Sequence, residues 1–157
     1  GNKSVVIKTA ANADAAKYSS HANILEHLQG VAQRLSLDDS KKYKLQFFYY
    51  RPNLVWGTTD VAANINHAEK IVVGIVSSTE ANVNTDYTYE EVITLEKTEG
   101  WKEYNITFDL PDIIQKNPGK SFEKCAIFFN IVPEIDSAQK TLKTLVNLDD
   151  ISLTETK

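Results

Sequence analysis

The sequence predicts an all-β protein, built as an antiparallel β-sandwich or barrel of about eight or nine strands. Two observations carry this prediction. Apolar and polar residues alternate with period two in short runs, and turn residues separate these runs. No long segment has the 3.6-residue periodicity that an amphipathic helix requires. A chain of 157 residues fits one compact domain, so we expect a single domain over 1–157.

The N-terminal part contains one clear strand and one ambiguous segment. The β-branched run at 4–8 predicts a strand, and the Ala-rich polar stretch at 12–20 predicts a loop. The segment 21–28 fits either a helical stripe or an alternating strand. We favour the strand, because strand-like sequence follows and Gly30 fits a turn between them. The segment 31–37 alternates again.

The segment 42–50 is the strand on which the domain is centred. One face carries Tyr43, Leu45, Phe47 and Tyr49, and the other carries Lys44, Gln46, Phe48 and Tyr50. Alternation of this kind predicts one buried face and one solvated face. The solvated face nevertheless ends in two aromatic residues. Because folding does not require exposed aromatic rings, these two indicate a binding surface.

The remaining segments continue the β pattern. The segment 69–77 is apolar on both faces, as in a central strand. The segment 100–110 alternates most clearly, and its residues predicted to face the core are Tyr104, Ile106, Phe108 and Leu110. Further strands are predicted at 89–96, 122–132 and 142–154, a helical turn at 112–115, a turn at 117–120, and loops at 53–68, 78–87 and 133–140.

Composition excludes several function classes. A net charge of −4 argues against nucleic acid as the partner, because the protein surfaces that bind nucleic acid are basic. The longest apolar runs are far shorter than the roughly 20 residues of a membrane span. The single cysteine, Cys125, cannot form an internal disulfide and shares its parity with core residues, so we expect a buried thiol.

Three segments together resemble the jelly-roll carbohydrate-binding modules of the family 4/9 type, within the wider galactose-binding-domain-like group. The first is 37–51, a turn followed by a tyrosine-rich strand that ends at Arg51. The second is the Trp-x-x-Tyr-x-x-x-Phe strand from Trp101 to Phe108, and the third is the closing Asn-Leu-Asp-Asp-Ile-Ser-Leu strand at 147–153. Each motif alone has low specificity, but the three occur in the order and spacing of that group.

The resemblance implies a jelly roll of two stacked sheets that binds sugar on its concave face or at the rim loops. It also implies an extracellular, cell-surface or periplasmic location. The group's opening segment, a glycine followed by an aromatic and an acidic residue, is missing here. We therefore expect that the first strand is trimmed or replaced by residues 4–8.

A glycan site needs aromatic rings for the C–H faces of sugars and fixed polar groups for their hydroxyls. Trp56, in a long loop beside Gly57, is the first candidate, and the alternative is that it plugs one end of the sandwich. Trp101 is expected to be core or rim packing instead. The candidate carbohydrate-binding residues are Trp56, Tyr50, Phe48, Arg51, Phe128, Asn130, Tyr87 and Tyr89.

Asp149 and Asp150 are the candidate metal ligands. The resemblance implies a structural calcium ion held by an aspartate at this point, far from the sugar. Calcium takes six to eight oxygen ligands, however, and neighbouring strand residues point in opposite directions. The alternative is that one of the two carboxylates accepts a hydrogen bond from a turn. No other cofactor is expected.

No catalytic signature is present. His21, His27 and His67 lack metal-ligand spacing, and there is no nucleophile elbow or phosphate-binding loop. A glycosidase needs two carboxylates that flank a cleft, and the acidic residues Glu90, Glu91, Asp109 and Asp112 show no distinguishing spacing. The sequence therefore predicts a non-catalytic carbohydrate-binding module. A protein-interaction or adhesion module on the same scaffold, able to contact other protein modules, is the alternative.

Overall fold

The computed structural model describes residues 5–8, 30–51, 65–77, 88–132 and 143–156. Within these ranges the chain forms nine strands and one short helix, in the order β1 (Val5–Lys8), β2 (Gly30–Leu35), β3 (Lys42–Tyr50), β4 (Ile65–His67), β5 (Lys70–Ser77), β6 (Thr88–Thr94), β7 (Lys102–Asp109), α1 (Leu110–Lys116), β8 (Cys125–Val132) and β9 (Lys143–Thr156).

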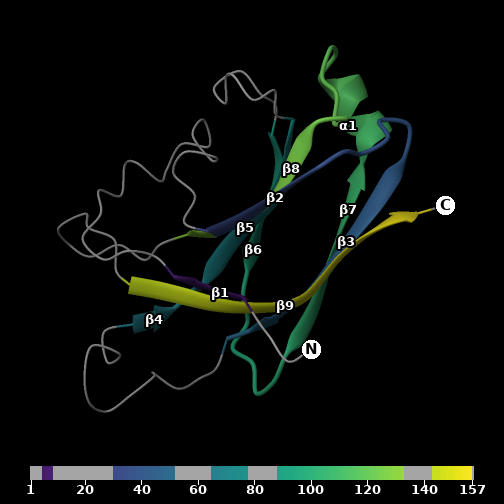
Figure 1. Cartoon of the computed structure of the whole chain (residues 1–157). Coiled ribbons are helices and arrows are strands. Elements are labelled where there is room, and N and C mark those ends of the chain that lie inside the picture. Colours follow the sequence, from purple (N-terminus) through teal and green to yellow (C-terminus); the bar gives the residue numbers. More distant parts are fainter. Residues whose placement is uncertain (1–4, 9–29, 52–64, 78–87, 133–142, 157) are drawn as a thin grey trace.

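The strands form two sheets, which Figure 1 shows as two layers. One sheet has the order β1-β9-β3-β7, with β4 also paired to β9, and is called here the β3 sheet. The other has the order β2-β8-β5-β6 and is called the β5 sheet. All pairings are antiparallel except that of β4 with β9. The predicted all-β antiparallel sandwich is therefore confirmed.

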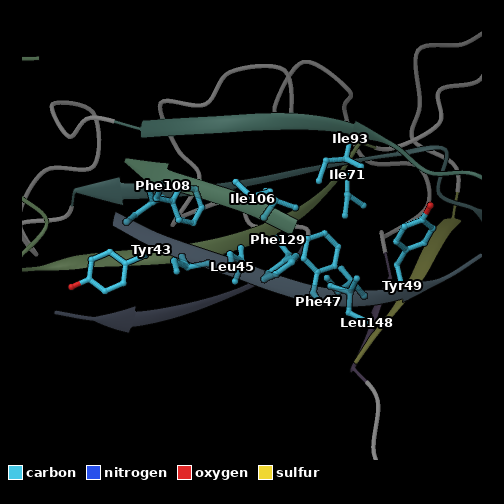
Figure 2. Close-up of a cluster of buried hydrophobic side chains, with 14 of the residues drawn as sticks. Tyr43, Leu45, Phe47, Tyr49, Ile71, Ile93, Ile106, Phe108, Phe129 and Leu148 are labelled. Atoms are coloured by element: carbon cyan, nitrogen blue, oxygen red, sulfur yellow. The ribbon is translucent and has the colours of Figure 1, made fainter. Parts of the chain in front are cut away.

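The core between the two sheets follows the period-two pattern of the sequence. The four odd-numbered residues of β3, from Tyr43 to Tyr49, are buried, and its even-numbered residues from Lys44 to Tyr50 are half-buried. The Phe47 ring meets the Phe129 ring of the opposite sheet edge to face, with centroids 5.0 Å apart (Figure 2). This contact joins the two layers at the centre of the domain.

The buried tyrosines at the two ends of β3 place their hydroxyls on backbone donors. The Tyr43 hydroxyl accepts a hydrogen bond from the Asp38 N–H at 2.9 Å, and that of Tyr49 accepts one from the Glu96 N–H at 3.3 Å. A buried hydroxyl without such a partner would destabilise the fold. Each tyrosine therefore also fixes the loop at its end of the sandwich.

β5 is central and buried on both faces, as its uninterrupted apolar run predicts. Its inward residues join the main core, while its outward residues Val72 and Val76 form a second cluster with Ala126 and Phe128 of β8. Cys125 is buried as expected, and its Sγ lies 3.5 Å from the Leu35 carbonyl oxygen.

The structure differs from the sequence prediction in three local respects. Gly30, expected in a turn, is the first residue of β2 and pairs with Asn130. The segment 53–68, expected to be a loop, contains the three-residue strand β4. The turn expected at 112–115 is a longer helix, because the Asp109 carboxylate accepts the Asp112 N–H at the start of α1 and Pro111 fits its first turn. The segments 12–29, 78–87 and 133–140 lie outside the described residues.

β9 contains a β-bulge where it passes β3. Gln46 pairs with Ser152 and Phe48 pairs with Asp149, so two residues of β9 are opposite Phe47 alone. Asp150 within the bulge has a φ of 47°, a backbone conformation that aspartate tolerates better than most residues. Among the described residues, no helix is long and apolar enough to cross a membrane.

Candidate functional site

The outer surface of the β3 sheet carries an aromatic pair at one end. β3 and β7 pair up to Tyr49 and Lys102, so the next two residues, Tyr50 and Trp101, come to lie side by side. Their ring centroids are 5.7 Å apart and their planes are tilted by 40°. Trp101 remains 45% exposed, and Tyr50 is half-buried. Two large rings are therefore held together in contact with solvent.

The next row of the same surface combines a third ring with two carboxylates. Phe48 pairs with Glu103 of β7 on one side and with Asp149 of β9 on the other. Paired residues of antiparallel strands point to the same face. Since neighbouring strands are about 4.8 Å apart, the two carboxylates lie roughly 10 Å apart on either side of the ring. Glu103 is exposed, and Phe48 and Asp149 are half-buried.

Uncharged polar side chains complete this surface. The row beyond Phe48 consists of Gln46, flanked by Asn105 of β7 and Ser152 of β9. Amides and hydroxyls of this kind can donate and accept hydrogen bonds. We call the whole surface the aromatic face and define it by Gln46, Phe48, Tyr50, Trp101, Glu103, Asn105, Asp149 and Ser152.

Arg51 holds the segment that leads into Trp101. Its N–H donates to the Thr98 hydroxyl at 3.1 Å, its carbonyl accepts the Thr98 N–H at 2.8 Å, and its guanidinium donates to the Leu95 carbonyl at 3.3 Å. The guanidinium also lies 3.8 Å from the Glu69 carboxylate, and only 11% of the side chain is exposed. Arg51 was predicted to contact sugar; in the structure two of its guanidinium nitrogens face Leu95 and Glu69, so little of the side chain is open to a ligand.

The first and last residues of β7, Lys102 and Asp109, form ion pairs. Lys102 binds Glu96, and this hydrogen bond raises the pKa of its ammonium. Lys42 lies 2.5 Å from Asp109, and that contact, helped by the Asp112 N–H, holds the pKa of the Asp109 carboxyl below its ordinary value. Asp109 thus has a structural role at the start of α1.

Two predicted site residues belong to the other sheet. Phe128 and Asn130 lie on β8, so they cannot form one patch with Phe48 and Tyr50 of β3. Asn130 is half-buried, whereas Phe128 has no exposed surface. Phe128 was a candidate on the condition that its strand shared a sheet with Phe48 and Tyr50; this condition is not met, and its ring is buried. Its ring tip lies close to Gly74, the neighbouring residue on β5, and it packs in the apolar cluster of the outer surface.

The remaining aromatic candidates fall in three different places. Tyr89 points inward from β6 and meets Phe108 edge to face, with centroids 6.1 Å apart, so it belongs to the core and not to an open binding surface. Trp56 and Tyr87 lie outside the described residues. Trp101, which we expected to be core or rim packing, is instead the most exposed ring of the aromatic face. Its parity with Glu103 and Asn105 was the signal that places it outward.

Asp149 and Asp150 are explained by the bulge. The Asp149 carboxylate accepts the Asp150 N–H at 2.8 Å, which confirms the alternative of a hydrogen-bonded turn. Calcium requires six to eight oxygen ligands, and the part of the chain that the structure describes holds no group of three or more potential ligands. A structural calcium ion held at Asp149 and Asp150 therefore stays a prediction.

A cavity of about 490 Å³ opens between the sheets, where β2 faces the C-terminal half of β9. Its lining includes Val31 and Leu35 of β2, Phe129 of β8, and Ile151 and Leu153 of β9. No carboxylate is among the described residues that line it. Gln33 is the one polar side chain among the described residues that line it, so the cavity offers sugar hydroxyls fewer partners than the aromatic face does.

Neither a model of a known protein family nor a curated protein sequence matches this chain. Among solved structures, the chain is similar to one described as "CBM4 structure and function", at 16% identity and a TM-score of 0.50, over 81% of this chain and 61% of that one. It thus spans less than two-thirds of that structure. It is also similar to the CBM22-2 xylan-binding domain of Paenibacillus barcinonensis Xyn10C, at 13% identity and a TM-score of 0.50, over 81% of this chain and 71% of that one. The chain therefore has the jelly-roll fold of carbohydrate-binding modules.

Proposed function

We propose that this protein is a non-catalytic carbohydrate-binding module and that the aromatic face is its binding surface. The observation that carries the proposal is the contact between Tyr50 and Trp101, which keeps two rings side by side and open to solvent. The fold shared with carbohydrate-binding modules supports the same class of ligand. An extracellular, cell-surface or periplasmic location goes with this function.

The chemistry of the aromatic face suits a sugar chain. Sugar rings pack their C–H patches on aromatic faces, and Tyr50 and Trp101 offer such faces at one end. Hydroxyls need donors and acceptors in fixed positions, which Gln46 and Asn105 supply two rows further along the strands. Because the rows follow the strand direction at about 3.4 Å per residue, a glycan of several sugar units can contact both groups.

Catalysis is not part of the proposal. Glycosidases hold two carboxylates within a cleft that admits the substrate and controls water. Glu103 and Asp149 lie instead on the outer surface of a sheet, with Phe48 between them. Of the other acidic candidates, Asp109 pairs with Lys42 and Asp112 pairs with Lys116. A protein-interaction module on the same scaffold stays the alternative.

The test is a glycan panel measured with a matched pair of variants. Trp101→Ala should weaken binding of a glycan ligand about tenfold or more, as truncation of a central aromatic contact does. Val92→Ala is the control, since Val92 is 59% exposed on the outer surface of the other sheet. Absence of binding across the panel, or equal loss with both variants, would contradict the proposal in favour of a protein partner.

A further inference from the structure

The two carboxylates of the aromatic face have neutral partners. Glu103 accepts a hydrogen bond from the Asn105 side-chain amide at 2.9 Å, and Asp149 accepts the Asp150 N–H at 2.8 Å. No ion pair with a described cation involves either of them. Among the described residues, the face therefore presents two carboxylates without a cationic partner, on opposite sides of the Phe48 ring.

The described basic residues nearby are committed elsewhere or are distant. Lys102 binds Glu96, and the guanidinium of Arg51 is held by Leu95 and Glu69. Lys44 shares the outer face of β3, but it is four residues from Phe48. At about 3.4 Å per residue this is roughly 13 Å, more than the Debye length of about 8 Å at physiological salt. Among the described charged groups, the two carboxylates are therefore the ones closest to the Phe48 ring.

Aromatic rings beside carboxylates form a site for a cation. The face of a ring attracts an ammonium group through its quadrupole, and tryptophan does so most strongly. A carboxylate adds a charge-assisted hydrogen bond, which is stronger than one between neutral groups. Acidic sugars would be repelled, because their carboxylates or sulfates would lie close to Glu103 and Asp149.

We propose that the aromatic face selects glycans that carry ammonium groups, namely polymers of deacetylated amino sugars, over neutral and acidic glycans. This inference rests on the proposed function, since it assigns a ligand class to the same surface. A sugar polymer fits better than a basic peptide, because the amide and hydroxyl row of Gln46, Asn105 and Ser152 continues the surface.

The experiment compares three oligosaccharides of equal length by calorimetry below neutral pH: an oligomer of glucosamine, its N-acetylated counterpart and an oligogalacturonate. We expect the glucosamine oligomer to bind about three- to fivefold more tightly than the acetylated one, and the oligogalacturonate most weakly. The advantage should shrink when salt is raised to about 0.15 M and beyond, as expected for exposed charges.

Two variants of equal charge separate a local effect from a global one. Glu103→Gln keeps the shape of an exposed side chain and should remove most of the preference for the glucosamine oligomer. Glu123→Gln makes the same change of net charge at an exposed position before β8 and should leave the preference unchanged.

The outcomes distinguish this inference from the function on which it rests. If none of the three oligosaccharides binds and a broader panel also fails, the proposed function is wrong. If the acetylated oligomer binds as tightly as the glucosamine oligomer, and Glu103→Gln changes neither, the function stands and the charge selection is overturned. An oligolysine peptide that binds as tightly as the glucosamine oligomer, and with the same dependence on Glu103, would also overturn it.

Discussion

Two outward-facing aromatic positions of this sandwich have opposite environments. On the β3 sheet, Tyr50 and Trp101 contact each other and stay open to solvent. On the β5 sheet, Phe128 also points away from the main core, yet it has no exposed surface. Strand parity assigns all three rings to outer surfaces, so parity alone does not explain the difference.

The neighbours on adjacent strands also differ between the two positions. Phe128 pairs with Gly74 on β5 and clusters with Val72 and Val76 of that strand, so its surroundings are small or apolar. Tyr50 pairs with Asn147, and the next row holds two carboxylates. Small and apolar neighbours favour a ring that lies against the sheet, whereas polar neighbours keep a surface hydrated. The comparison teaches that strand parity has to be read together with the cross-strand neighbours before an outward ring is assigned to an open surface.

The largest effect on the free energy of unfolding is expected from truncation of the buried Phe128 ring. Phe128→Ala should lower the free energy of unfolding by about 3–5 kcal/mol, because it removes a fully buried aromatic side chain. Urea unfolding measures the effect. Trp101→Ala serves as the matched control and should cost less than about 1 kcal/mol, since its ring is exposed. A loss below about 1 kcal/mol for Phe128→Ala would mean that its ring is free to contact a ligand after all.

A second test adds volume beneath the same ring. A Cβ at Gly74 would lie 2.3 Å from the Tyr89 carbonyl oxygen and 2.8 Å from Cζ of Phe128. Gly74→Ala should therefore lower the free energy of unfolding by about 1–3 kcal/mol. Gly100→Ala is the control, because a Cβ there would have no atom within 4 Å. Equal unfolding midpoints for the two variants would contradict the close packing of Phe128 on β5.

Much of the fold follows from period-two alternation. The inward residues of β3, the double-faced burial of β5 and the burial of Cys125 were all predictable from residues on a single strand. The site was less predictable, because it depends on which strands pair. Phe48 and Phe128 look equivalent in sequence but belong to different sheets. The β9 bulge at Asp150 likewise arises from its pairing with β3.

A third test measures how deeply β8, the strand of Phe128, is packed on its inner side. Burial raises the pKa of the Cys125 thiol to about 12, and the Asp39 carboxylate adds to the rise. In the unfolded chain the thiol ionises near pH 9, so the folded state keeps the thiol proton up to a higher pH. The stability that the protonated Cys125 thiol contributes below pH 9 is therefore lost as the pH rises toward 12.

The comparison of thermal midpoints with Cys125→Ala isolates this contribution. The substitution removes the ionisable group, so the stability advantage of the wild-type protein should shrink steadily above pH 9. Lysines titrate in the same range but equally in both proteins. Parallel pH profiles for the two proteins would show that the thiol is accessible to water, and that the inner side of β8 is loosely packed.

The smallest expected effect concerns the bulge that places Asp149 beside Phe48. Asp150 has a φ of 47°, where a Cβ is unfavourable and glycine is not. Asp150→Ala should therefore be less stable than Asp150→Gly by about 1 kcal/mol, although both variants lose the same carboxylate.

Unfolding in calcium and in a chelator also tests the metal implied by the family resemblance. If calcium raises the unfolding midpoint of the wild-type protein but not of either variant, Asp150 is a ligand. If the alanine and glycine variants have the same free energy of unfolding, the bulge does not set the position of Asp149.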